Sequence, residues 1–160
     1  MQPLFSSSHG TTVDLHGVVR EIIAFIAADP KRAYKIIIGS DSEQYNSSTG
    51  ADFVTAIVVH RVGNGGRYFW RRVALGRFHT LRDRIIKEVL LSLDLAQELL
   101  EELKGQDNLA WDFEIHVDIG ERGETKVLIQ EVVGMIRASN FEVRTKPLSY
   151  AASKVADRHV

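Results

Sequence analysis

The sequence has no cysteine and no long apolar run. Without cysteine there are no disulfide bonds, thiolate metal sites or thiol nucleophiles, and a reducing compartment is compatible with the composition. No stretch approaches the roughly 20 apolar residues that a membrane span needs. Met1 to Gly10 also lacks the basic cluster and the apolar run of a secretory signal. We therefore expect a cytoplasmic protein with no membrane partner.

Net charge is also small, at −1 for the chain, which argues against binding nucleic acid by overall electrostatic attraction. The charges are nevertheless segregated along the sequence. Arginine and lysine dominate from Arg61 to Lys87, whereas aspartate and glutamate dominate from Glu88 to Glu131. The two blocks could form a basic and an acidic surface, or they could be solvated faces without functional meaning.

The composition is that of an average globular protein, with 44% hydrophobic and 26% charged residues. It indicates neither disorder nor a fibrous state. A chain of 160 residues buries roughly 68–70% of its unfolded surface as one domain, so a single core is sufficient. We expect one domain over residues 1–160, with residues 1–10 forming a disordered tail.

The apolar pattern predicts helices alternating with strands. Helices are expected at 13–28, 80–104, 124–138 and 149–158, and strands at 34–39, 53–62, 67–75, 113–119 and 141–145. Thr80 suits the N-cap of the second helix, and Gly63-Asn64-Gly65-Gly66 is a strong hairpin signal. This order predicts an α/β fold with a five-stranded mixed sheet, in which a three-strand antiparallel meander precedes two parallel strands and helices cover both faces.

Asp41 is the first candidate for chemistry, because it follows the apolar run Tyr34 to Gly39. Active sites of open α/β sheets favour the carboxyl ends of strands. Gly39, on the same face as Asp41, would let another group approach closely. The competing interpretation is an ordinary turn-forming aspartate, which this position alone favours.

Glu88 is a sharper signal, because it falls on the apolar arc of the helix that begins at Thr80. At about 100° per residue, this arc also contains Leu81, Ile85, Val89, Ser92, Leu95, Ala96 and Leu99. The other acids of the helix fall on the opposite side: Asp83, Asp94, Glu98, Glu101 and Glu102. A buried carboxylate is costly unless it is paired, protonated or bound to metal. Alternatively, Glu88 lies at the edge of the arc and reaches water.

The fourth predicted strand alternates apolar residues with Glu114, His116 and Asp118. A solvated sheet face would explain this pattern. Because the strand lies between two helical segments, however, both faces of the sheet should be covered. Asp118 is then a second acid at the carboxyl end of a strand, and His116 is interpreted as a structural histidine.

Other chemistries lack their motifs. The sequence contains no Gly-x-Ser-x-Gly elbow, no glycine-rich phosphate loop and no His-Glu-x-x-His, and its six histidines lack ligand spacing. Oxygen ligands from Asp41, Glu88 and Asp118 would suit Mg²⁺ or Mn²⁺. Asp157 shares a helical phase with Tyr150 and Ser153, which by itself indicates an ordinary exposed aspartate.

Several segments together resemble the YkuK-type family of the ribonuclease H-like superfamily. They are Ile38-Gly39-Ser40-Asp41-Ser42, Thr80-Leu81-Arg82-Asp83-Arg84-Ile85, His116-Val117-Asp118-Ile119-Gly120, Lys146-Pro147-Leu148-Ser149-Tyr150-Ala151-Ala152-Ser153 and Val155-Ala156-Asp157. The resemblance covers nearly the whole chain from Tyr34 onward. It implies a ribonuclease H-like fold, to which the N-terminal helix is an addition.

The resemblance also implies a carboxylate site of Asp41, Glu88, Asp118 and Asp157 that holds one or two Mg²⁺ or Mn²⁺ ions. In such a site Asp41 bridges both ions, Asp118 and Glu88 complete the shell of one ion, and Asp157 serves the other. The implied activity is phosphodiester hydrolysis in RNA, DNA or a hybrid, by ions about 4 Å apart.

Two other functions remain open. The first is a module that keeps the fold and acts as an adaptor or binds nucleic acid with little or no turnover, because fold does not determine function. The second is hydrolysis of a small phosphorylated compound. No sequence pattern identifies contacts to a 2′-hydroxyl, so the choice between RNA, DNA and a hybrid is open, as is the oligomeric state.

Overall fold

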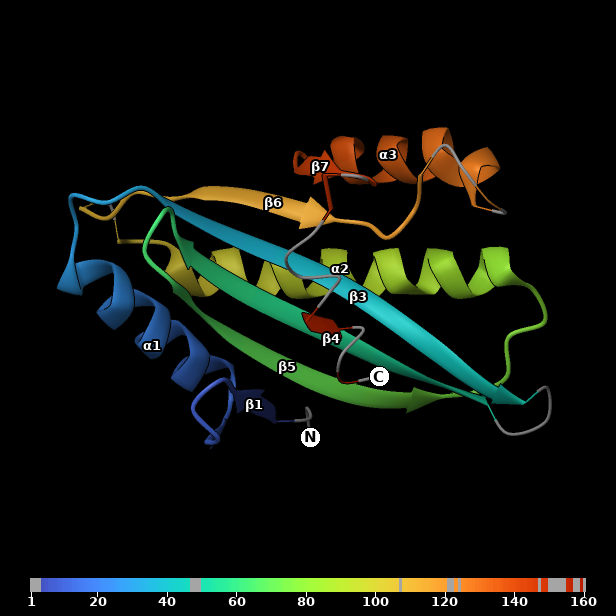
Figure 1. Cartoon of the computed structure of the whole chain (residues 1–160), viewed down its shortest axis with the longest axis horizontal. Helices are drawn as coiled ribbons and strands as arrows, with labels where there is room; N and C mark the ends of the chain where they lie inside the picture. Colours follow the sequence, from blue (N-terminus) through green and yellow to red (C-terminus); the bar gives the residue numbers. More distant parts are fainter. Residues whose placement is uncertain are drawn as a thin grey trace.

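The computed structural model describes residues 4–46, 50–106, 108–120, 123, 125–146, 148–149, 155–156 and 159. Figure 1 shows a twisted sheet with α2 behind it and the C-terminal segment, of which residues 155–156 and 159 are described, in front of it. In chain order the elements are β1 (Phe5–Ser7), β2 (Thr12–Val13), α1 (Leu15–Ala28), β3 (Tyr34–Asn46), β4 (Gly50–Arg61), β5 (Gly66–Leu75), α2 (Leu81–Leu103), β6 (Asp112–His116), a 3₁₀ turn (Lys126–Leu128), α3 (Ile129–Ala138) and β7 (Glu142–Arg144). In the described part of the chain, no helix is long and apolar enough to cross a membrane.

The sheet has seven strands in the order β2-β1-β5-β4-β3-β6-β7. Strands β3, β4 and β5 form an antiparallel meander, and β6 and β7 extend it with parallel pairing. The predicted five-stranded mixed sheet is therefore confirmed, with β1 and β2 as an additional short edge. The hairpin between β4 and β5 is also as predicted, and Gly63 and Gly65 have φ angles of 78° and 81° in its turn.

The expected disordered tail at residues 1–10 is wrong for residues 5–7. These residues form β1, which pairs with β5 through Ser6↔Trp70 and Ser7↔Phe69. Phe5 is only 1% exposed, and the Arg71 guanidinium lies 4.9 Å from the centre of its ring. A three-residue strand leaves no periodic signal in a sequence, whereas burial of one aromatic ring contributes roughly 1.5–3 kcal/mol.

Helix starts follow local capping. The Asp14 carboxylate accepts a hydrogen bond from the Gly17 N–H at 2.8 Å at the start of α1, and the Thr80 hydroxyl accepts one from the Asp83 N–H at 3.0 Å at the start of α2. The predicted N-cap at Thr80 is thus confirmed. The third helix is shorter than predicted, because residues 126–128 form a 3₁₀ turn before α3. Of the last predicted helix, 149–158, Val155 and Ala156 are helical and Ser149 is not, and the other residues lie outside the described ones. His159, just after the predicted end, is also helical.

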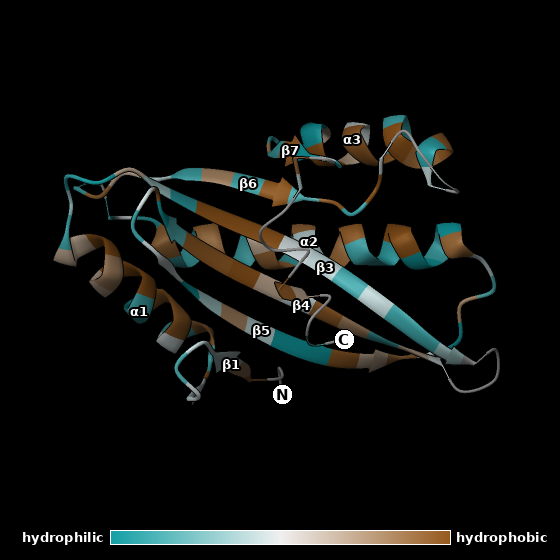
Figure 2. Ribbon diagram, in the orientation of Figure 1, coloured by the Kyte–Doolittle hydropathy of each residue, from teal (hydrophilic) through white to brown (hydrophobic). Residues whose placement is uncertain are grey.

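The two faces of the sheet are covered unequally. One face packs Ile36 and Ile38 of β3 into the main core with α1, α2 and α3. The other face buries Ile37, Val54 and Ala56 under Ala156 of the C-terminal segment. Both faces are therefore covered, as predicted. Figure 2 shows that β3 is apolar in its first half and more polar in its second half, which is where the candidate site lies.

Candidate functional site

Strand β3 continues past the end of its parallel neighbour. Its described pairing with β6 ends at Gly39↔His116, whereas its pairing with β4 continues through Asp41↔Val54 to Asn46↔Gly50. The prediction that the strand ends at Gly39 is therefore wrong. What ends there is the pairing with two strands, because beyond Gly39 the described pairing of β3 is with β4. Asp41 lies inside a strand, just beyond the point where β6 stops.

Glu88 approaches this part of β3 from α2. Its side chain is only 8% exposed, so its predicted place on the buried arc of the helix is confirmed. The Ser42 hydroxyl donates a hydrogen bond to Glu88 Oε2 at 2.5 Å. One turn earlier on α2, Arg84 Nη1 donates to the Ser42 carbonyl at 3.0 Å. Ser42, the residue after Asp41, thereby connects β3 to α2.

The pKa of Glu88 is raised from its usual value of 4.5 to about 8. Burial is the largest cause, and the negative charges of Asp41 and Asp118 raise it further. The hydrogen bond from Ser42 and the positive charge of Arg84 act in the opposite direction and only partly offset these effects. Glu88 is therefore a largely protonated carboxyl at pH 7, with two other acids as electrostatic neighbours.

Asp118 follows the end of β6. Its Oδ1 lies 2.9 Å from the Lys146 ammonium. The parallel pairs Ile37↔Glu114 and Gly39↔His116, continued by two residues, set Asp118 level with Asp41 on the same face of the sheet. On β3, Asp41 Oδ1 accepts a hydrogen bond from the Ser42 N–H at 2.9 Å. Asp157, the fourth acid expected in the site, lies outside the described residues.

Within the described ranges, no three Asp, Glu or His side chains are close enough together to hold a metal ion. The chemistry of Asp41, Glu88 and Asp118 nevertheless fits a hard divalent cation, because all donors are carboxylate oxygens. A positive charge among them would also remove the repulsion that helps to raise the pKa of Glu88. In the structure, Ser42 binds Glu88 and Lys146 binds Asp118 instead.

A buried hydroxyl network beside the site was not predicted. Ser40 Oγ lies 2.9 Å from Thr55 Oγ1 and 2.8 Å from Ser92 Oγ, so it joins β3, β4 and α2. Ser92 is one turn after Glu88 on the same buried arc. A serine inside an apolar arc was the available signal, but its partners on two strands could not be read from the sequence. The network fixes α2 against β3 next to Asp41.

His116 pairs with Gly39 and so lies on the same face of the sheet as Asp41. Its Nε2 is 2.9 Å from Glu114 Oε1. The pKa of His116 is lowered, mainly because burial disfavours the charged ring. Burial alone would raise the pKa of Glu114, but the hydrogen bond with His116 and the charges of Arg144 and Lys35 together lower it. This pairing supports the interpretation of His116 as a structural histidine.

The basic block between Arg61 and Lys87 is divided over the molecule. Arg61 and Arg67 both pack over the Phe25 ring, at 4.0 and 4.7 Å from its centre. Arg71 pairs with Thr55 and Arg72 with Val54, so these consecutive side chains point to opposite faces of the sheet. The block therefore does not gather into one basic surface.

The family model described as ribonuclease H-like matches residues 17–160 of the chain. The chain belongs to the ribonuclease H-like family. It is also 33% identical to the uncharacterized protein YkuK of Bacillus subtilis (strain 168), over 97% of this chain and 95% of that protein, which confirms the resemblance to YkuK. The ribonuclease H-like assignment and the mixed sheet agree on the fold class.

Solved structures of ribonuclease H proteins are more distant. Ribonuclease H1 from the halophilic archaeon Halobacterium salinarum is 14% identical, with a TM-score of 0.41 over 79% of this chain and 99% of that chain. The N-terminal ribonuclease H domain of rv2228c from Mycobacterium tuberculosis is 17% identical, with a TM-score of 0.40 over 79% of this chain and 99% of that chain.

Proposed function

We propose that this protein is a Mg²⁺- or Mn²⁺-dependent nuclease that hydrolyses phosphodiester bonds of RNA or DNA. The observation that carries the proposal is the burial of Glu88 within electrostatic range of Asp41 and Asp118. Packing does not explain a carboxyl at this position, because an aliphatic side chain would fill the same arc without the desolvation cost of a carboxylate. A site that binds a cation explains both the burial and the surrounding negative charge.

Asp41, Glu88 and Asp118 would hold the metal, together with Asp157. When bound, the ions would activate water and stabilise charge on the phosphate and the leaving oxygen. Glu88 must lose its proton to become a ligand, and the Ser42 hydroxyl orients its carboxyl group. Arg84 in turn holds the Ser42 carbonyl. These contacts fix the Glu88 carboxyl group against β3 and reduce the freedom that it would lose on binding a cation.

The second candidate is an adaptor or nucleic-acid-binding module that has the fold without efficient turnover. Two observations favour it. The carboxylates do not converge on one point among the described residues, and the net charge of −1 provides no overall attraction for nucleic acid. This candidate differs from the first in one measurable respect, because it binds an oligonucleotide without cleaving it.

The test is cleavage of labelled single-stranded RNA, single-stranded DNA, an RNA–DNA hybrid and duplex DNA, with Mn²⁺ or Mg²⁺. We expect the wild type to cleave at least one substrate and Asp41→Asn to lose the activity at least 100-fold, because removing one strong electrostatic contribution at a reacting centre typically costs about 10²–10³ in rate. Asp94→Asn, on the exposed side of α2, is the control and should keep the wild-type rate. Equal turnover by the wild type and Asp41→Asn would refute the nuclease proposal, and binding without cleavage would support the module.

A further inference from the structure

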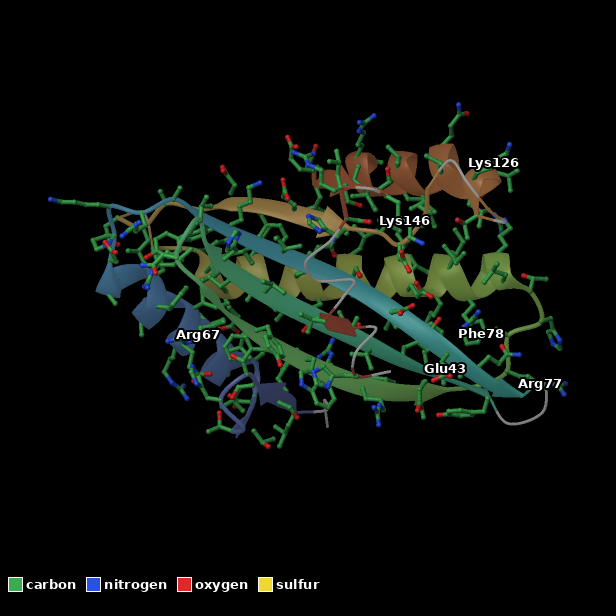
Figure 3. All side chains as sticks on the ribbon, in the orientation of Figure 1. Glu43, Arg67, Arg77, Phe78, Lys126 and Lys146 are labelled. Carbon is green, nitrogen blue, oxygen red and sulfur yellow. The ribbon has the colours of Figure 1, made fainter. Side chains whose placement is uncertain are left out.

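The Lys146 ammonium pairs directly with a carboxylate of the candidate site. It lies 2.9 Å from Asp118 Oδ1, and the two side chains are 57% and 37% exposed. Figure 3 labels Lys146 near the carboxyl end of β6. The pair is therefore open to solvent, at the edge of a site whose inner carboxyl, Glu88, is buried.

The main chain holds Lys146 close to Asp118. The Val117 N–H donates to the Arg144 carbonyl at 2.9 Å, and the Lys146 N–H donates to the Ile119 carbonyl at 2.7 Å, so the chains that follow β6 and β7 stay side by side. Gly120 makes this approach possible, since a Cβ atom there would lie 2.9 Å from the Lys146 Cβ. The glycine thus leaves room for the lysine beside Asp118.

Stability does not explain this arrangement. Exposed ion pairs contribute about 0–1 kcal/mol. The pair of Lys104 with Glu101 at 2.7 Å shows that the chain also makes such a pair between near neighbours, at the end of α2. So small a gain in stability would not require the chain segments after β6 and β7 to approach each other, with Gly120 between them. The position of Lys146 next to the carboxylates is the feature that needs an explanation.

We propose that Lys146 is a substrate-contacting residue, which neutralises Asp118 in the free protein and binds a phosphate of the nucleic acid in the complex. This inference rests on the proposed function and adds a residue to it. A cation that binds Asp118 competes with the ammonium for the same oxygen. The ammonium is a compact charge on a flexible stem of four carbons, so it can leave Asp118 for a phosphate that enters the site from solvent.

The first experiment measures Mn²⁺ binding by isothermal titration calorimetry in the absence of nucleic acid. The variants are Lys146→Met, Lys146→Arg and the control Lys104→Met. Removing the competing ammonium should make Lys146→Met bind Mn²⁺ about two- to five-fold more tightly, which corresponds to the range of an exposed ion pair. Lys146→Arg and Lys104→Met should bind Mn²⁺ within about two-fold of the wild type.

The second experiment measures binding of a fluorescein-labelled single-stranded oligonucleotide in Ca²⁺ at several salt concentrations. Loss of one phosphate contact should reduce the logarithmic salt slope by about 0.7 in Lys146→Met, whereas Lys146→Arg and Lys104→Met should keep the wild-type slope. A circular dichroism melt checks that each variant folds.

A Lys146→Met variant that folds normally and keeps both the wild-type Mn²⁺ affinity and the wild-type salt slope would overturn the inference. In that outcome the nuclease proposal would stand if the wild type still cleaves nucleic acid and Asp41→Asn does not. If the wild type neither binds nor cleaves any oligonucleotide, the proposed function fails first and the phosphate contact fails with it.

Discussion

Glu88 is a buried carboxyl group on an otherwise apolar arc of α2, with negatively charged neighbours. Its place on an apolar arc could be derived from helical periodicity. Its electrostatic neighbours could not, because they come from β3 and from the chain after β6. Burial disfavours the ionised form, and the nearby charges of Asp41 and Asp118 add to this effect, so the pKa rises to about 8. Metal-free protein therefore carries a carboxyl group that ionises far more readily after unfolding.

The first prediction is the pH dependence of stability in EDTA. Because the folded-state pKa of Glu88 is raised, its contribution to the free energy of unfolding is fully present below about pH 4.5 and is lost as the pH rises to about 8. The loss should be on the order of a few kcal/mol. Glu88→Gln cannot ionise and should lack this decline, so above pH 8 it should be more stable than the wild type.

Urea unfolding of the wild type, Glu88→Gln and the control Asp94→Asn between pH 4 and 9 measures this effect. Asp94 is exposed on the same helix, so its variant should follow the wild-type profile. If Glu88→Gln is less stable than the wild type at every pH, then Glu88 is a residue with a satisfied structural partner and its place in a metal site is wrong.

At the scale of elements, β3, α2 and the chain after β6 each contribute one carboxyl group to the candidate site. Three features of α2 could be predicted from sequence, namely its Thr80 cap, its length and its buried arc, because each depends on residues close together in the chain. The extension of β3 beyond Gly39 could not be predicted, since its polar half pairs with β4 and is bonded to α2 through Ser40 and Ser42, rather than showing an apolar pattern. Contacts such as Ser42 with Glu88, 46 positions apart, need the fold to be known first.

The C-terminal segment is attached to β5 by a stacked pair of rings. The centres of the Trp70 and His159 rings are 4.1 Å apart with an interplanar angle of 9°, and Arg72 donates a hydrogen bond to the His159 carbonyl. Aromatic pairs contribute about 0.5–1.5 kcal/mol beyond area burial. This attachment holds the segment across the sheet face on which Asp41 lies.

The second prediction is that loosening this attachment weakens metal binding if Asp157 belongs to the carboxylate set. His159→Ala should bind Mn²⁺ less tightly than the wild type by roughly two- to ten-fold, whereas His159→Phe keeps a ring against Trp70 and should bind normally. Calorimetric titration measures the affinities, and Trp fluorescence reports whether the stack is lost. If the stack is lost and the Mn²⁺ affinity is unchanged, the C-terminal segment does not contribute to the metal site and this prediction is wrong.

At the scale of the whole molecule, the sheet face that carries Asp41 is the face over which we expect nucleic acid to approach Asp41 and Asp118. The pairs Asp41↔Val54 and Val54↔Arg72 set Arg72 in one row with Asp41, two strands away, and Arg72 is exposed. Arg71 points to the opposite face, where its guanidinium packs over Phe5. A sequence block of arginines therefore divides into residues on the proposed binding face and residues away from it.

The third prediction follows from this division. Arg72→Gln should lower the magnitude of the logarithmic salt slope of nucleic-acid binding by about 0.7–0.9, the value for one phosphate contact. Arg71→Gln is the matched control from the neighbouring position and should keep the wild-type slope. Fluorescence anisotropy at several salt concentrations distinguishes them, and a larger change for Arg71→Gln would place the nucleic acid on the opposite face.

A crystal structure of the protein grown with Mn²⁺ tests the metal site most directly. Anomalous scattering from manganese identifies the ion independently of its ligands. We predict one or two anomalous peaks bound by Asp41, with Glu88 and Asp118 as further ligands and Lys146 released from Asp118. A structure at saturating Mn²⁺ with no anomalous peak at Asp41, and with Lys146 still paired to Asp118, would contradict the proposal that these carboxylates form a metal-dependent nuclease site.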